Sequence, residues 1–254
     1  MQHALITAVL APVLLVQGRR VRRTALELPE AAGPREGVTG QGPPFSLLVL
    51  GDSAAAGVGI ATQEEALTGC LVRALSTERT VHWRLVAHSG DRLSHILRAA
   101  EKAPPQAADL VVVSAGINDV LQGISPAKWT GLLHELARCF EQRFQARRVA
   151  FSGIPRIQEF TLLPQPLAWY LGLGARRLNR ATRQALPGLP GAWQLVDLDL
   201  PLTADFLARD GFHPNEAASQ LWSERVLASL PKPLRGRACV CRPCALGSRP
   251  AETP

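Results

Sequence analysis

Four short blocks, in a fixed order along the chain, hold the residues best suited to chemistry. They are Gly51-Asp52-Ser53, Gly90, Gly116-Ile117-Asn118-Asp119 and Asp210-Gly211-Phe212-His213. A serine hydroxyl becomes a nucleophile when a base takes its proton, and a carboxylate orients that base. Ser53, His213 and Asp210 supply these three groups. Gly90 and Asn118 add N–H donors that could hold a developing oxyanion, so the blocks together predict acyl transfer through a serine.

Each block also has a plain structural explanation. Gly-Asp-Ser alone is an ordinary turn with a serine cap, and Gly90 suits any tight turn. Asn118 could close an Asx-turn, and we expect Asp52 and Asp119 to brace their turns rather than to react. The Asp-x-x-His block is the sharper signal, because none of the other histidines has a carboxylate at this spacing. These are His3, His82, His88, His95 and His134.

Apolar runs that alternate with helix-like segments must position these blocks. We expect strands over 45–50, 81–87, 110–114, 148–153 and 193–198, and helices over 64–76, 92–102, 127–144, 167–184 and 215–230. Five strand–helix alternations predict an α/β fold with a five-stranded parallel sheet and helices on both faces. In such sheets ligands bind beyond the carboxyl ends of the strands. Ser53, Gly90 and Asn118 follow the first three strands, so this architecture gathers them at one edge.

The two ends of the chain differ in composition from this body. Residues 1–45 and 231–254 hold most of the formal net charge of +7, which leaves the stretch between them nearly neutral. A nucleic-acid partner is not expected, because binding one needs clustered cations. Residues 24–44 are rich in Pro, Gly and Glu and predict a linker to a domain over 45–230. Residues 231–254 predict a mobile basic tail.

The N-terminal region, 1–23, joins the apolar stretch 4–16 to an arginine cluster at 19–23. A secretory signal would place its cations before the apolar stretch, so secretion is disfavoured and a cytoplasmic location is expected. The stretch is short for a membrane span, which takes about 20 residues. If it inserts, the arginines keep the catalytic body in the cytoplasm. The alternative is an apolar arm that lies on the protein or on a membrane surface.

The five cysteines have no disulfide-framework spacing, which favours a reducing compartment. Cys239, Cys241 and Cys244 form a C-x-C-x-x-C in the tail. Three sulfurs without a nearby histidine do not complete a zinc site, so no metal is expected.

Taken together, the four blocks resemble those of the SGNH hydrolase superfamily, the GDSL-type esterases and lipases, over about residues 45–230. The resemblance implies a flavodoxin-like three-layer sandwich, with Ser53 as nucleophile and Asp210 and His213 completing a triad. It also implies that Gly90 and Asn118 form the oxyanion hole with the Ser53 N–H. Ala54 stands where the family often has leucine, which leaves the chemistry untouched.

We therefore expect a carboxylic-ester hydrolase that needs no cofactor and whose partner is a small-molecule acyl ester. An acyl-thioesterase or lysophospholipase and a sugar O-acetyl esterase stay open, because one triad serves all of them. Outside the enzymes, the alternative is a membrane-tethered binding module of the same fold. The Pro-broken stretch 154–170 could line an acyl pocket or simply pack as an irregular connection. Its apolar residues are Phe160, Leu162, Leu163, Leu167 and Trp169.

Overall fold

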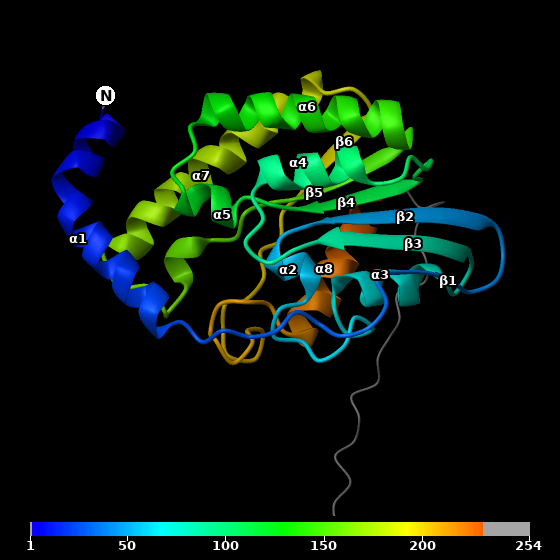
Figure 1. The fold of residues 1–254 in the computed structure, drawn as a ribbon, viewed down its shortest axis with the longest axis horizontal. Coiled ribbons are helices and arrows are strands. Elements are labelled where there is room, and N and C mark those ends of the chain that lie inside the picture. Colours follow the sequence, from blue (N-terminus) through cyan, green and yellow to red (C-terminus); the bar gives the residue numbers. More distant parts are fainter. Residues whose placement is uncertain (1, 231–254) are drawn as a thin grey trace, which may run out of the picture.

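The computed structural model describes residues 2–230, with side chains from residue 9 onward. The tail predicted over 231–254, with Cys239, Cys241 and Cys244, lies outside the described residues. Figure 1 shows one twisted sheet between two layers of helices, as the α/β expectation requires. The strands are β1 Glu36–Thr39, β2 Pro44–Gly51, β3 Thr80–Ala87, β4 Leu110–Ser114, β5 Arg148–Ser152 and β6 Ala192–Val196. The helices are α1 Gln2–Thr24, α2 Ser53–Ala56, α3 Leu67–Leu75, α4 Leu93–Lys102, α5 Ile117–Leu121, α6 Pro126–Phe144, α7 Leu167–Ala185 and α8 Glu216–Ser229.

The sheet has the strand order β1-β3-β2-β4-β5-β6, and β2 to β6 are parallel. Its central strands are buried on both faces, which explains why they read as continuous apolar runs. On β2, Leu48 and Leu50 contact the layer formed by α4, α6 and α7. Leu47 and Val49 contact the layer formed by α2, α3 and α8. All five predicted strands are present.

The prediction of a five-stranded sheet is wrong by one strand, because β1 adds a sixth at the edge. It pairs antiparallel with β3, from Glu36 opposite Arg84 to Thr39 opposite Val81. The strand lies inside residues 24–44, which were predicted to be a linker. Its four residues are mostly exposed, so they carry no apolar alternation that the sequence could reveal.

The same segment is also held to the loop that follows β3. The Arg35 guanidinium donates to the Ala87 carbonyl at 2.5 Å and pairs with the Glu30 carboxylate. Glu30 in turn accepts a hydrogen bond of 2.7 Å from the Ser89 N–H. These contacts fix the backbone immediately before Gly90.

Helix α1 packs against α7 at the end of the molecule toward which the strands β2 and β3 run (Figure 1). Leu14 is buried, and Leu10 and Val21 pack against the same core. The Gln17 side-chain amide donates to the Gln165 carbonyl at 2.7 Å and accepts from the Leu167 N–H at 3.1 Å. Within residues 2–230, no helix combines the length and the apolar character that crossing a membrane would require.

Candidate active site

The turn after β2 presents Ser53 at the carboxyl edge of the sheet. A Cβ on Gly51 would lie 2.6 Å from the Ala55 Cβ and 2.9 Å from the Ser114 Cβ, so only glycine fits where the chain leaves the strand. The Asp52 side chain caps α2 by accepting from the Ala54 N–H at 3.3 Å. Ser53 is thus the first residue of a short helix, and its hydroxyl faces the loop that precedes α8.

That loop carries His213 and Asp210, and the three side chains lie in line. The His213 Nε2 is 2.9 Å from the Ser53 Oγ, and its Nδ1 is 2.6 Å from the Asp210 Oδ2. The other oxygen of Asp210 accepts from the backbone N–H groups of Phe212 and His213, at 2.9 and 3.0 Å. Ser53 and His213, 160 positions apart in the chain, are thus joined by a line of hydrogen bonds that continues to Asp210.

The surroundings of Asp210 keep its carboxylate charged. Burial raises its pKa, but the hydrogen bond from His213 and those from the Phe212 and His213 N–H groups outweigh burial, and the pKa is below its usual value. Phe212 also packs edge-on against the His213 ring, with centroids 5.1 Å apart. A charged Asp210 fixes the tautomer that leaves the Nε2 free to accept a proton.

Gly90 lies on the loop after β3, and Asn118 lies in the first turn of α5, directly after β4, so both stand at the carboxyl edge that their positions predict. The Asn118 side-chain amide donates to the Asp91 carbonyl at 2.9 Å, which ties α5 to the loop after β3. An amide nitrogen carries two hydrogens, so one N–H of Asn118 remains for a ligand. Gly90 has a φ of 81°, a left-handed conformation that favours glycine. Across residues 2–230, neither the Ser53 N–H nor the Gly90 N–H donates to a protein acceptor.

Asp52 and Asp119 brace these turns, as expected. Asp52 is 3% exposed and accepts from the Ser114 hydroxyl at 2.9 Å, which joins the ends of β2 and β4. Its burial raises its pKa to about 6, although hydrogen bonds from Ser114 and Ala54 act in the opposite direction. Asp119 accepts from the Leu93 N–H at 3.0 Å at the start of α4, and burial raises its pKa. Among the described residues, no group of His, Cys, Asp and Glu is arranged to hold a metal ion.

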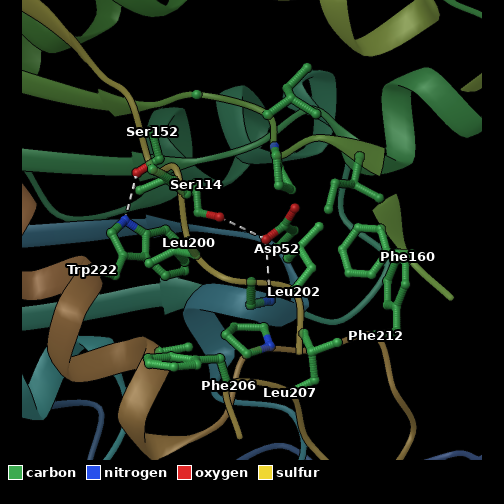
Figure 2. A pocket seen from close by; sticks show the side chains of 18 of the residues that line it. Asp52, Ser114, Ser152, Phe160, Leu200, Leu202, Phe206, Leu207, Phe212 and Trp222 are labelled. Carbon is green, nitrogen blue, oxygen red and sulfur yellow. Dashed lines mark hydrogen bonds between the residues drawn. The ribbon is translucent and has the colours of Figure 1, made fainter. Parts of the chain in front are cut away.

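Figure 2 shows an apolar hollow at the carboxyl ends of β2, β4 and β5. It is lined by direct chain neighbours of the site residues: Ala54 beside Ser53, Ile117 beside Asn118, and Phe212 and Pro214 on either side of His213. Polar atoms of Asp52, Ser114 and Ser152 lie at one side, and the Ser152 hydroxyl accepts from the Trp222 indole at 3.0 Å. The other walls come from Phe160, Leu200, Leu202, Phe206, Leu207 and Phe212.

A substantial part of the hollow is lined by a segment that was not predicted from the sequence. Of the stretch 154–170, Ile154, Pro155 and Phe160 line the hollow. Leu167 is buried in the core instead, and Trp169 is 40% exposed. The main wall is the segment 198–207, LDLPLTADFL, which directly precedes the Asp-x-x-His block. The leucines that recur in this segment, shortly before the candidate base His213, were the sequence signal that could have indicated an apolar wall.

Residues 49–221, about two thirds of the chain, match the model of the GDSL-like lipase/acylhydrolase family. Among curated protein sequences none matches the chain.

Several solved structures share the fold. A structure of TesA is 25% identical, with a TM-score of 0.59, and covers 74% of this chain and 99% of its own. The psychrotrophic esterase EstA from Pseudoalteromonas sp. is 21% identical with a TM-score of 0.56, and covers 72% and 95%. An extracellular lipase from Streptomyces rimosus is 18% identical with a TM-score of 0.55, and covers 74% and 100%.

Proposed function

The chain belongs to the GDSL-like lipase/acylhydrolase family, and we propose that this serine hydrolase cleaves acyl esters through Ser53, His213 and Asp210. The observation that carries the proposal is the line of hydrogen bonds from the Ser53 Oγ through the imidazole to the Asp210 carboxylate. A serine at the carboxyl edge of a sheet is a common turn residue. A serine whose hydroxyl is hydrogen-bonded to an oriented histidine can transfer its proton to that histidine.

The reaction follows the two steps of acyl transfer. The Ser53 Oγ attacks the acyl carbon while the His213 Nε2 takes its proton, and the carbonyl oxygen becomes an oxyanion. The N–H groups of Ser53 and Gly90 and the Asn118 amide are the donors proposed to hold that oxyanion. The intermediate collapses, the ester C–O bond breaks, and the departing alcohol takes the proton from His213.

The second step returns the enzyme to its starting state. A water gives a proton to His213 and attacks the acyl group on Ser53, and a second tetrahedral intermediate forms. Its collapse breaks the bond to Ser53, which recovers the proton from His213, and releases the carboxylic acid. No cofactor takes part in either step.

The apolar hollow supports an acyl chain longer than acetyl as the group bound beside Ser53. Leu202, Leu207 and Phe206 offer hydrocarbon walls that such a chain would contact. A sugar acetate would leave such walls unfilled. The triad itself does not distinguish an ester from a thioester, so both are included in the test.

A fluorophosphonate probe tests the nucleophile. We expect it to label the full chain at Ser53 and to leave Ser53→Ala unlabelled. A folded protein that resists the probe would instead favour a non-catalytic binding module.

Leu202→Trp tests the proposed acyl pocket, because it places a larger side chain in the hollow. On nitrophenyl esters and acyl-thioesters of increasing chain length, we expect the variant to lose activity on the longer chains and to retain it on acetyl. The control is Leu121→Trp at a position that is 43% exposed. An unchanged chain-length profile in Leu202→Trp would place the acyl chain elsewhere.

A further inference from the structure

One exposed face of α1 changes from apolar to basic along its length. Val9, Val13, Val16, Arg20 and Arg23 follow one another at spacings of four and three residues, which places them on one side of a helix. Val9 is 69% exposed, Val13 45% and Val16 66%, and both arginines are exposed. We call these five residues the outer face of α1.

A second face of α1 fixes the helix on the body, so the direction of the outer face is set by the fold. Leu10, Leu14 and Val21 pack into the core, and Gln17 bonds to the backbone where α7 begins. The exposure of the three valines is therefore a fixed feature of the folded protein. Burying valine side chains away from water is favourable, so binding of an apolar partner to the outer face would lower the free energy.

The charges on α1 identify the kind of partner. Arg19 and Arg22 flank the outer face, so four arginines stand within about one turn of its end. Among the described residues, none of these four forms an ion pair with a carboxylate. An apolar patch that contacts the acyl layer next to a cluster of arginines that meets anionic headgroups is typical of protein surfaces that attach to membranes.

We propose that the outer face of α1 docks the protein on an anionic lipid surface, with Val9, Val13 and Val16 in the outer acyl layer. No described helix is suited to crossing a bilayer, so α1 lies on the surface rather than spanning it. The helix stands at the end of the molecule where β2 and β3 finish, which is also the end that carries Ser53 and Gly90 (Figure 1). Docking there brings the proposed acyl pocket to a source of lipid esters, and this last consequence alone rests on the proposed function.

Sedimentation with vesicles tests the docking directly. The full chain is mixed with phosphatidylcholine vesicles that either contain or lack phosphatidylglycerol, at low and at high salt. We expect binding to the anionic vesicles that weakens with salt, and much less binding to phosphatidylcholine alone. Absence of the protein from every vesicle pellet overturns the proposal.

Two pairs of variants separate the outer face from general surface effects. Val9→Ser/Val16→Ser should weaken vesicle binding by about tenfold or more, since two apolar side chains no longer enter the acyl layer. The matched control Val38→Ser/Leu121→Ser changes two exposed apolar residues elsewhere and should bind as the wild type does. Arg19→Gln/Arg20→Gln/Arg23→Gln should lose tenfold to hundredfold on anionic vesicles, given roughly 1 kcal/mol per basic residue.

The control for the arginines is Arg176→Gln/Arg177→Gln/Arg180→Gln, which removes the same charge from exposed positions on α7. Equal losses in both triple variants would show unspecific attraction and overturn the proposal. So would a lipid-free dimer, seen by sedimentation equilibrium, that Val9→Ser/Val16→Ser dissociates. Hydrolysis of a water-soluble ester is measured on every variant and should stay at the wild-type rate, which separates a failure of docking from a failure of the proposed function.

Discussion

Two carboxylates stand next to the proposed nucleophile and base, and their pKa values are shifted in opposite directions. Asp52 directly precedes Ser53 and is buried, with its pKa raised to about 6. Asp210 lies three residues before His213, and its pKa is lowered. Burial raises the pKa of both groups; for the fully buried Asp52 it outweighs the hydrogen bonds, and for Asp210 the hydrogen bonds outweigh it.

The donors around Asp52 are all neutral: the Ser114 hydroxyl, the Ala54 N–H and the backbone N–H of Asp52 itself. Asp210 receives two backbone N–H groups and the His213 ring, which gains positive charge whenever it takes a proton. The carboxylate in the turn after β2 therefore holds the backbone, whereas the carboxylate in the loop before α8 stays charged beside His213, the proposed base. Position beside a reactive residue does not decide which role an aspartate has.

The largest expected effect tests whether these two regions work as one unit. Ser53→Ala and His213→Ala should each lower kcat by a factor on the order of 10⁴ to 10⁶, because the nucleophile and its base are useless alone. The double variant should be little worse than either single one. Steady-state rates on a soluble ester measure this, and losses that multiply would mean that the two residues act independently.

The second prediction contrasts the two aspartates directly. Asp210→Asn should lower kcat by about 10³ to 10⁴, since an amide disturbs the histidine tautomer that the carboxylate fixes. Asp52→Asn keeps an oxygen for Ser114 and Ala54 and should stay within about tenfold of the wild type, as expected of a residue that holds only the turn. Comparable losses in both variants would give Asp52 a direct part in catalysis.

The third prediction concerns Asn118, whose amide links α5 to the loop after β3. Asn118→Ala should lower kcat by about 10² to 10³, the cost of one oxyanion donor, with a smaller change in KM. It also removes the bond to the Asp91 carbonyl, so the melting temperature is measured alongside. A KM that rises while kcat holds would make Asn118 a substrate-binding residue instead.

Much of this arrangement could be predicted from the sequence, because its signals are local. The central strands are buried on both faces and read as apolar runs, and the residues that follow β2, β3 and β4 gather at the carboxyl edge by topology alone. The strand β1 could not be found this way, since Glu36–Thr39 is held by its pairing with β3 and buries no apolar stripe. The contribution of Leu202 and Leu207 to the hollow depends on the path of an irregular segment, which periodicity does not describe.

The smallest effect, on stability, isolates the carboxylate of Asp52. Its pKa is about 6 in the folded protein and near 3.8 when unfolded, so the folded state holds this proton more tightly. The contribution of Asp52 to stability is therefore fully present below the unfolded pKa and is lost as the pH rises through the folded one. The shift corresponds to roughly 3 kcal/mol in the free energy of unfolding.

Asparagine resembles the protonated acid and does not titrate, so Asp52→Asn should escape this loss. Urea unfolding of both proteins between pH 3.8 and well above 6 gives the difference in their unfolding free energies. That difference should move in favour of the variant through this window and then level off, while Asp119 and Asp210 cancel because both proteins contain them. A difference that stays flat with pH would mean that Asp52 titrates alike in the folded and unfolded chains, and the contrast between the two aspartates would then rest on Asp210 alone.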